Sequence, residues 1–189
     1  MGIFQADFAT VDAGFPVYEK GMYRVKVSKR TPFVRESEDR KNPGTTKISA
    51  GVRYGLEMFG RLDEESGEYI ATDENGKEIR GKTVSAPSVY LHSEGARSFS
   101  KLFFMAILGF SLNEENEFNS WSQEHKDDFA FSGEAEDSTE LLEENLGDGW
   151  DAPLDRFVNV YMKKVPNMDG SGFDQEFSAW QPVGERVEL

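Results

Sequence analysis

Alternating apolar and polar residues in the first third of the chain predict two long β-strands. Between residues 21 and 34 the two alternating sets are Tyr23, Val25 and Val27 on one face and Arg24, Lys26 and Ser28 on the other. A period of two residues is typical of a strand with one buried face. Residues 46–59 alternate in the same way, and their apolar set is Ile48, Ala50, Val52, Tyr54, Leu56 and Met58. Both strands are therefore expected to present basic residues on an outer face.

Glycines and a polar segment interrupt this pattern in two places. Gly51 and Gly55 fall on the expected outer face of the second strand, where interior glycines mark a bulge, a bend or a surface that another molecule approaches closely. Between the two strands, residues 35–45 combine basic residues (Arg35, Arg40, Lys41 and, just beyond, Lys47) with the turn-forming triplet Asn42-Pro43-Gly44. We expect this segment to be an exposed, mobile loop.

The middle of the chain predicts a hairpin, a further strand and a helix. An Asn75-Gly76 pair between residues 68–72 and 77–84 is a strong hairpin signal. A strand is expected over residues 84–92, although Pro87 restricts its pairing. Residues 97–110 follow the rhythm of an amphipathic helix, with a buried stripe of Phe99, Leu102, Phe103, Ala106, Ile107 and Phe110. Gly109 is suited to cap its C-terminal end.

The last third consists of an acidic segment followed by two more strands. Within residues 113–149, Asp137 and Glu140 precede an apolar run and predict a short capped helix that ends at Gly147. This segment is a candidate for disorder, although its aromatic residues argue against a purely solvated chain. Residues 156–165 then alternate, with Val158, Val160 and Met162 inward and Phe157, Asn159, Tyr161 and Lys163 outward. A final strand is expected over residues 174–183.

The order of these elements predicts a mainly β fold. The predicted order is two strands, the hairpin strands, a helix, the acidic insert and two final strands. A five-stranded Greek-key barrel of the OB type has this order, and its helix lies between the third and fourth strands. A β-sandwich stays open as an alternative, because strand order cannot be read from one sequence. At 189 residues the chain has the length of one OB-like domain, 1–189, with residues 113–150 as an acidic insert before the fourth strand.

Composition limits the compartment and the class of protein. The chain has no cysteine, so it has no disulfide framework or thiolate metal site, which suits a reducing compartment such as the cytoplasm. No apolar run reaches 18 residues, and the N-terminal residues lack a basic start followed by an apolar stretch. We therefore expect neither a signal peptide nor a membrane association.

Charge is sorted along the chain. Residues 19–53 hold ten Lys/Arg and four Asp/Glu, a net charge of +6, whereas residues 113–155 hold one Lys and fifteen Asp/Glu, a net charge of −14. Binding of a polyanion depends on the local field at one face rather than on the total charge of −14. The basic strands can thus attract a polyanion, and the insert can compete with it.

Catalytic and metal-binding patterns are weak. The two histidines, His92 and His125, are far apart and lie among polar residues, and the sequence contains no nucleophile elbow and no phosphate-binding loop. Residues 167–173 resemble the first half of a calcium loop, but Ser178 stands where the pattern requires Glu. Acidic residues between 148 and 155 could also gather a cation, but such loops usually stay solvated. We expect no enzyme activity, no metal and no cofactor.

Aromatic and basic side chains share the outer faces of the predicted strands. Single-stranded nucleic acid offers backbone charge and exposed base faces, so its binding proteins combine Lys/Arg with aromatic platforms. The candidate nucleic-acid-binding residues are Arg24, Lys26, Lys29, Arg30, Lys47, Arg53, Phe59, Phe157, Tyr161 and Lys163. The same pattern would arise if these aromatic residues packed under the insert and the basic residues only solvated the sheet.

In layout the chain resembles the phage-encoded single-stranded DNA-binding proteins of the OB-fold type. The likeness lies in Asp7-Phe8 before the strand Gly21–Val27, in a long second strand ending at Gly60-Arg61, in the helix 99–109 and in the closing pair of strands. It implies a sequence-tolerant single-stranded DNA-binding protein of phage DNA replication or recombination, acting in the host cytoplasm, and a homo-oligomer is compatible with it.

The resemblance also implies a role for acidic residues. Proteins of this family commonly end in an acidic tail that recruits replication or recombination enzymes and competes for the DNA groove. Here the C-terminus, residues 184–189, is only weakly acidic, so we transfer this role to the insert. Its candidate partner-binding residues are Glu134, Glu136, Asp137, Glu140, Glu143 and Glu144. The alternative is a virion structural or interaction protein, or an acidic inhibitor that imitates DNA.

Overall fold

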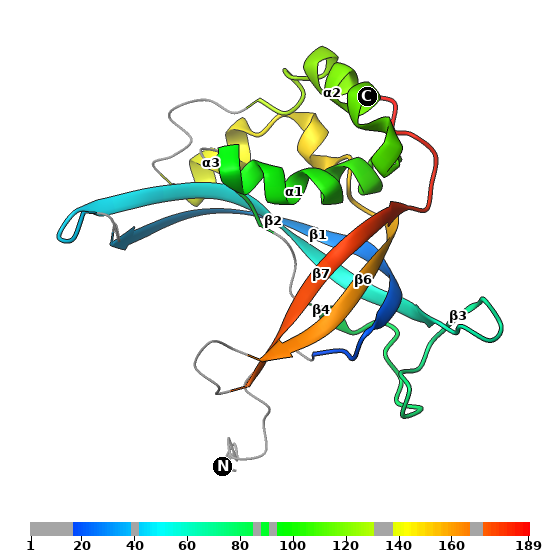
Figure 1. Ribbon diagram of the computed structural model, residues 1–189. Coiled ribbons are helices and arrows are strands. Elements are labelled where there is room, and N and C mark those ends of the chain that lie inside the picture. The colour runs from blue at the N-terminus through cyan, green and yellow to red at the C-terminus, as the bar shows by residue number, and fades with distance from the viewer. Residues whose placement is uncertain (1–16, 39–41, 85–87, 91–93, 131–137, 167–171) are drawn as a thin grey trace, which may run out of the picture.

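The computed structural model describes residues 17–38, 42–84, 88–90, 94–130, 138–166 and 172–189 (Figure 1). The strands are β1 (Gly21–Glu38), β2 (Thr46–Leu62), β3 (Tyr69–Ile70), β4 (Thr83–Val84), β5 (Ser88–Tyr90), β6 (Phe157–Pro166) and β7 (Phe173–Pro182). The helices are α1 (Glu94–Ile107), α2 (Glu115–Glu124) and α3 (Thr139–Asn145), with short 3-10 helices η2 (Leu112–Glu114) and η4 (Asp148–Asp151). The prediction of a mainly β protein is confirmed.

One antiparallel sheet contains all seven described strands. Its main path runs β3-β2-β1-β6-β7, and β4 and β5 both pair with β2. Neither β4 nor β5 pairs with β7, so the described sheet is open and does not form the closed five-stranded barrel that the sequence predicted. The strand expected over residues 84–92 corresponds to β4 and β5, which have only two and three residues. These strands are too short to complete a ladder across the opening.

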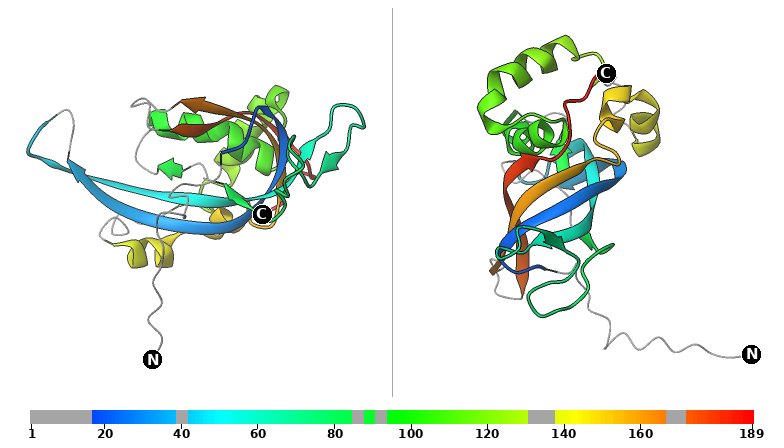
Figure 2. Two further views of the ribbon diagram at one scale, coloured as in Figure 1. Left: turned by 90° about the horizontal axis from the view of Figure 1, so that it is seen from below. Right: turned by 90° about the vertical axis from the view of Figure 1, so that its right-hand side faces the viewer.

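Strands β1 and β2 extend together beyond the body as a long curved arm (Figures 1 and 2). Their pairing continues from Tyr23 opposite Arg61 to Glu38 opposite Thr46. Residues 35–38 of the segment predicted as a loop over residues 35–45 therefore belong to β1, residues 42–45 form the turn before β2, and residues 39–41 lie outside the described part. At the tip of the arm, Ile48 is 44% exposed, in contrast to its predicted inward position, because the core does not reach that far.

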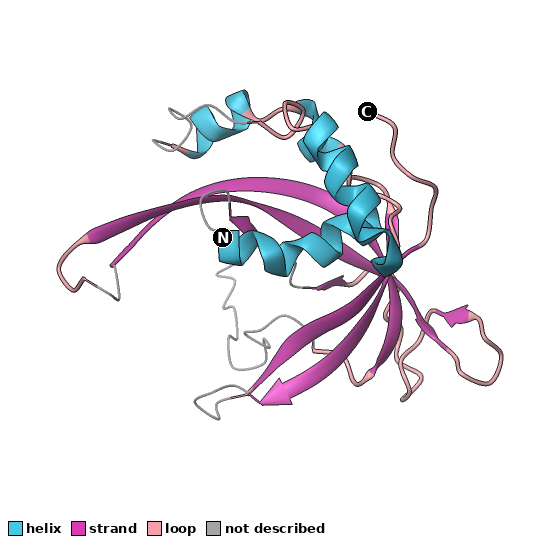
Figure 3. Ribbon diagram, turned by 45° about the horizontal axis from the view of Figure 1, so that its top comes forward, coloured by secondary structure: helices cyan, strands magenta, loops and turns pink. Residues whose placement is uncertain are grey.

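The helices gather at one side of the sheet and complete the core (Figure 3). Helix α1 is buried over residues 103–107, because one side contacts the sheet and the other contacts the insert. Phe104 shows this arrangement: its ring lies 5.8 Å from that of Tyr54 in β2 and 5.9 Å from that of Trp150 in η4. Leu102, which the predicted stripe placed inward, is 42% exposed.

The acidic insert is folded wherever it is described. Phe118, Leu142 and Trp150 belong to the same hydrophobic cluster as the inward residues of the strands. Helix α3 begins at Ser138, whose hydroxyl accepts the Leu141 N–H, and it ends at Asn145 rather than at the predicted Gly147. The predicted first residue, Asp137, lies outside the described residues. Aromatic burial thus overcomes the repulsion among the carboxylates.

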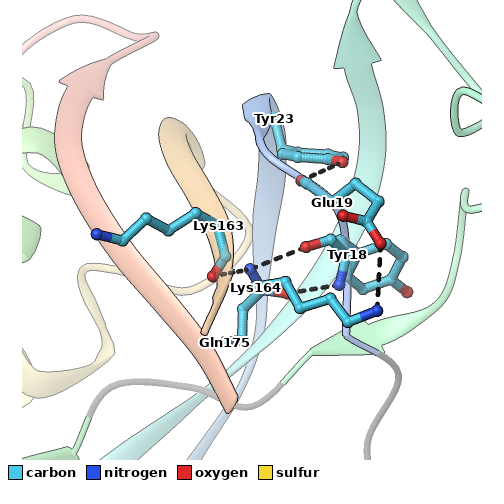
Figure 4. Close-up of polar contacts among 6 residues, drawn as sticks. All are labelled: Tyr18, Glu19, Tyr23, Lys163, Lys164 and Gln175. Carbon is cyan, nitrogen blue, oxygen red and sulfur yellow. Dashed lines mark hydrogen bonds and ion pairs between the residues drawn. The ribbon is translucent and has the colours of Figure 1, made fainter. Parts of the chain in front are cut away.

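Side chains from the β6–β7 hairpin fix the chain where it enters β1 (Figure 4). The Tyr18 N–H donates to Gln175 Oε1 at 2.6 Å, and Gln175 Nε2 donates to the Tyr18 and Lys163 carbonyls. The Tyr23 hydroxyl donates to the Glu19 carbonyl at 2.9 Å. These bonds hold the segment against the open end of the sheet, where Tyr18 is buried.

Candidate nucleic-acid interface

Side chains of β1, β2 and β6 that point away from the core form one continuous surface, which we call the outer strip. Pairing places Lys26 opposite both Glu57 and Phe157, and Arg24 opposite Asn159. The outer strip consists of Arg24, Lys26, Lys29, Arg35, Lys47, Arg53, Phe59, Phe157, Asn159, Tyr161 and Lys163. Nine of the ten candidate nucleic-acid-binding residues lie on it, and Arg30 does not.

The cations of the arm are free of carboxylate partners. Within the described part of the chain, no Asp or Glu oxygen lies within 4.0 Å of the charged nitrogens of Lys29, Arg35, Lys47 or Arg53. Arg53 lies over the ring of Phe33, with 5.4 Å from its guanidinium carbon to the ring centroid. That ring in turn approaches Gly51, where an added Cβ would lie 2.7 Å from Phe33 Cζ. Gly51 therefore accommodates an aromatic ring of the protein itself.

Aromatic residues dominate the other end of the outer strip. Phe59 and Phe157 form an edge-to-face pair with ring centroids 5.2 Å apart, and both are half-buried. Arg80, from the segment between β3 and β4, lies 4.8 Å over the Phe59 ring and donates through Nε to the Phe59 carbonyl. A base could stack on this cluster of rings and guanidinium, because both kinds of plane accept a π-face.

Arg24 lies at the aromatic end of the outer strip, beyond Lys26 and Phe157 as seen from the arm. Its Nε donates to Asn159 Oδ1 at 3.0 Å, and its guanidinium carbon lies 4.1 Å over the Tyr69 ring. Burial raises the pKa of the Tyr69 hydroxyl, and the adjacent Arg24 opposes that shift. No described carboxylate lies within ion-pairing distance of Arg24. Its guanidinium is therefore oriented but not neutralised.

Arg30 is the exception among the predicted site residues. It pairs with Tyr54 of β2, an inward residue, and its side chain is only 14% exposed. Its guanidinium contacts Asp151 at 2.8 Å and Glu143 at 2.5 Å. The reason is a bulge at Ser28, where the β1–β2 register shifts between Val27 and Lys29. Beyond it the odd-numbered residues face outward, so Lys29 joins the outer strip and Arg30 meets the insert.

Two further cations of the outer strip are partly neutralised at exposed positions. Lys26 lies 2.6 Å from Asp155, and this hydrogen bond is the main reason why the pKa of Lys26 is raised. Lys163 lies 2.9 Å from Glu176 of β7. Exposed pairs of this kind are worth at most about 1 kcal/mol and exchange readily for other anions. Both lysines thus remain available to a polyanion.

The predicted partner-binding carboxylates fall into two groups. Glu140, Glu143 and Glu144 lie on α3 and are exposed, and together with residues 29–32 of β1 they line an open groove of about 470 Å³. The Val34 N–H donates to the Thr139 hydroxyl, which ties α3 to the edge of the arm. Glu134, Glu136 and Asp137 lie outside the described residues.

Other sequence features make structural contacts. His125 lies 3.0 Å from Asp128 and 4.7 Å from the Trp121 ring centroid. Asp151 and Asp155, considered for a cation, instead pair with arginine and lysine. Among the described residues no group of three His, Cys, Asp or Glu side chains could hold a metal ion. The calcium-like residues 167–171 and His92 fall outside the described part.

Tyr69 and Arg80 are members of the aromatic cluster that sequence reasoning missed. Tyr69 lies in a strand of two residues, and Arg80 lies in the segment after the hairpin turn. Neither belongs to an alternating run, so strand parity could not place them. Their nearness to the Asn75-Gly76 turn was the only available signal, because a hairpin returns its chain along the edge of the preceding strand.

Comparison of the sequence with protein-family profiles and with curated proteins gives no match. In the described part of the chain, no helix has the length and apolar character needed to cross a membrane.

Proposed function

We propose that this protein binds single-stranded DNA along the outer strip, with little dependence on sequence and without catalysis. The observation that carries the proposal is one continuous face that combines two features: cations such as Lys29 and Arg53, which have no carboxylate partner among the described residues, and the half-buried pair Phe59 and Phe157. Single strands require this combination, because each base offers a π-face and each nucleotide a charge. A duplex hides its base faces, so it gains only the attraction between charges.

The topology supports this proposal. Strand β1 pairs with both β2 and β6, and α1 precedes β6 in the chain, as expected for an OB-type arrangement whose barrel would close between β7 and β4 or β5. OB folds bind oligonucleotides on the outer face of central strands and on adjoining loops. A phage protein of DNA replication or recombination is the biological role that we propose on the basis of the resemblance.

Within this proposal the acidic insert recruits protein partners rather than covering the DNA site. Helix α3 lies against the inward side of the arm, where Glu143 and Asp151 neutralise Arg30. Most cations of the outer strip face the opposite way, although Lys29 lines the groove beside α3 and Lys26 pairs with Asp155. Glu140 and Glu144 remain exposed on α3 and are available to a basic partner.

Substitutions along the outer strip test the proposal. Lys29→Ala and Arg53→Ala should weaken binding to all single strands alike and each reduce the salt slope by about 0.7. Phe157→Leu should weaken binding at least about fivefold, because a stacked base contributes about 1–3 kcal/mol. Lys126→Ala is the matched control, since it removes an exposed lysine from the acidic insert. If all three variants bind a thymine 30-mer as the parent does, the outer strip is not the site.

A second function is favoured by the folded state of the insert. Exposed carboxylates on α2 and α3 are held on a scaffold, as an inhibitor that imitates DNA or a virion interaction protein would require. The double variant Glu140→Gln with Glu144→Gln would then no longer bind the target protein. Neither the parent nor this variant would bind single-stranded DNA. Detectable binding of single-stranded DNA through the outer strip removes this alternative as the main function.

A further inference from the structure

Arg24 is held in one orientation at the aromatic end of the outer strip, and this orientation has a consequence for base recognition. Its position on β1 is fixed by pairing with Asn159, its Nε is used by Asn159 Oδ1 at 3.0 Å, and its plane lies over Tyr69 at 4.1 Å. Arg24 also hydrogen-bonds to the Tyr69 hydroxyl, and the remaining N–H groups of Nη1 and Nη2 are the donors left for a ligand. They form a planar fork of fixed geometry.

Asn159 makes the surroundings of this fork rich in donors. Because Oδ1 accepts from Arg24, the amide presents its Nδ2 group to other ligands. No described carboxylate lies within ion-pairing distance of Arg24, so no acidic acceptor competes at the fork. A ligand group that fits here must offer two adjacent acceptors rather than a donor.

The four bases differ in whether an edge presents two adjacent hydrogen-bond acceptors. Guanine offers O6 and N7 side by side, and an arginine fork binds this pair bidentately. On adenine the exocyclic amino donor adjoins N7, and on thymine the N3–H donor adjoins each carbonyl, so neither base presents two adjacent acceptors. Cytosine presents N3 and O2, a pair that is exposed only when the base is unpaired. The fork therefore discriminates among bases in a single strand.

We infer that Arg24, oriented by Tyr69 and Asn159, reads one base in an otherwise sequence-tolerant site and selects guanine through O6 and N7. The inference rests on the proposed function and specifies its substrate. A phosphate would also fit the fork, but Arg24 lies next to the Phe59–Phe157 pair, where bases stack, while Lys29, Arg35, Lys47 and Arg53 supply charge along the arm.

Short oligonucleotides test the inference on the unmodified protein. Thymine 12-mers with one central guanine, cytosine, adenine or 7-deazaguanine are titrated by fluorescence anisotropy at one salt concentration. Guanine should improve affinity by about fivefold or more over the all-thymine strand, since a bidentate contact discriminates by about 1–3 kcal/mol. 7-Deazaguanine lacks the N7 acceptor and should lose most of that gain. Equal binding of the guanine and 7-deazaguanine strands, or a larger gain with cytosine, overturns the assignment to guanine.

A charge-conserving variant tests the residue. Arg24→Lys keeps the positive charge but loses the planar fork, so it should abolish the guanine preference, measured as the ratio of affinities for the guanine and all-thymine strands. Arg35→Lys on the exposed arm is the matched control and should keep the preference. If Arg24→Lys retains the guanine preference, or weakens binding to every strand equally, Arg24 contacts phosphate and the inference fails. If the parent binds no strand at low salt, the proposed function itself fails, which is a distinguishable result.

Discussion

Ser28 determines which residues of β1 face outward. Before it, alternation places Tyr23, Val25 and Val27 in the core, as the sequence predicted. The bulge at Ser28 then shifts the phase by one residue, so Lys29 faces outward and Arg30 faces the insert. A one-residue bulge exchanges the two faces of every residue that follows it in the strand. This phase change decides which basic side chains are available to a polyanion.

Gly109 is a residue whose substitution should be costly. It ends the α1 segment with φ +90°, and a Cβ there would lie 2.6 Å from the Glu185 carbonyl oxygen. Gly109→Ala should lower the free energy of unfolding by at least about 1–2 kcal/mol, since both backbone strain and displacement of the C-terminal segment oppose it. Urea unfolding followed by tryptophan fluorescence measures this change.

Ala179 provides the opposite substitution as a control. It has φ +47° in a bulge of β7, opposite the register shift between Asn159 and Tyr161. Ala179→Gly should cost less than about 0.5 kcal/mol or stabilise the protein, because glycine adopts this conformation without strain. Equal losses in the two variants would show that backbone conformation is not the main cause of the destabilisation.

Tyr23 should make stability depend on alkaline pH. Burial, opposed by the Arg61 guanidinium, raises the pKa of Tyr23 to about 12 from its ordinary value of 10.0. The folded state therefore disfavours the phenolate, and this contribution is complete below pH 10 and is lost as pH rises toward 12. The loss should reach about 2–3 kcal/mol.

Urea unfolding between pH 8 and pH 12 checks this dependence. Tyr23→Phe loses the hydrogen bond to the Glu19 carbonyl, so it should be about 1 kcal/mol less stable at pH 8. It should also show a shallower decline above pH 10 than the parent. Parallel curves for parent and variant would contradict the assigned role of Tyr23. Tyr54, whose pKa burial also raises, accounts for alkaline dependence that remains in the variant.

At the scale of elements, the insert acts as a cap that belongs to the core. The Tyr54 hydroxyl donates to the Trp150 carbonyl at 2.8 Å, and Leu142 is fully buried. Deletion of residues 113–150 would therefore expose Phe104 and the underside of α1, and it would unfold the protein instead of testing the insert's function. Point substitutions are required to separate the structural role of the insert from its role in binding.

The contact between α3 and the arm offers such a substitution. Glu143→Gln with Asp151→Asn leaves the largely buried Arg30 guanidinium without its carboxylates, and it should cost about 1–3 kcal/mol of unfolding free energy. Because Arg30 faces away from the outer strip, affinity for single-stranded DNA should stay within about twofold. Calorimetry and anisotropy titration measure the two quantities.

A control with the same change of net charge isolates the effect. Glu117→Gln with Glu124→Gln also removes two carboxylates, from exposed positions of α2. A large rise in DNA affinity in the first double variant but not in the second would mean that the insert competes for the DNA site through Arg30.

Strand parity was the most informative part of the sequence. It placed Val158, Val160 and Met162 inward and Phe157, Asn159 and Tyr161 outward, as the structure shows. It failed where the cause was not local. The exposure of Ile48 depends on how far the core extends, Arg30 depends on a bulge, and Tyr69 and Arg80 enter the site through loop geometry. Open or closed pairing depends on contacts between distant strands, which alternation does not encode.

At the scale of the whole molecule, the acidic helices and most cations of the outer strip lie on different sides, and they meet where Lys29 lines the groove beside α3 and Lys26 pairs with Asp155. The helices with the acidic residues lie at one side of the sheet, and the cations of the outer strip face away from the core. This separation lets a protein with a net charge of −14 bind a polyanion, since attraction is local and screening limits repulsion to about 10 Å at 0.1 M salt. At low salt this screening is weak, so the carboxylates of the insert also repel DNA. Affinity there should therefore be lower than the cations of the outer strip would give without the insert.

The most direct test of the account is an anisotropy titration of a labelled thymine 30-mer with the unmodified protein over a series of salt concentrations, with duplex DNA as competitor. If Lys29, Arg35, Lys47 and Arg53 each neutralise one phosphate, log K should fall with log salt at a slope of about −2.8, and duplex should compete poorly. Absence of binding at low salt, or equal competition by duplex, would contradict the outer strip as a single-stranded DNA site.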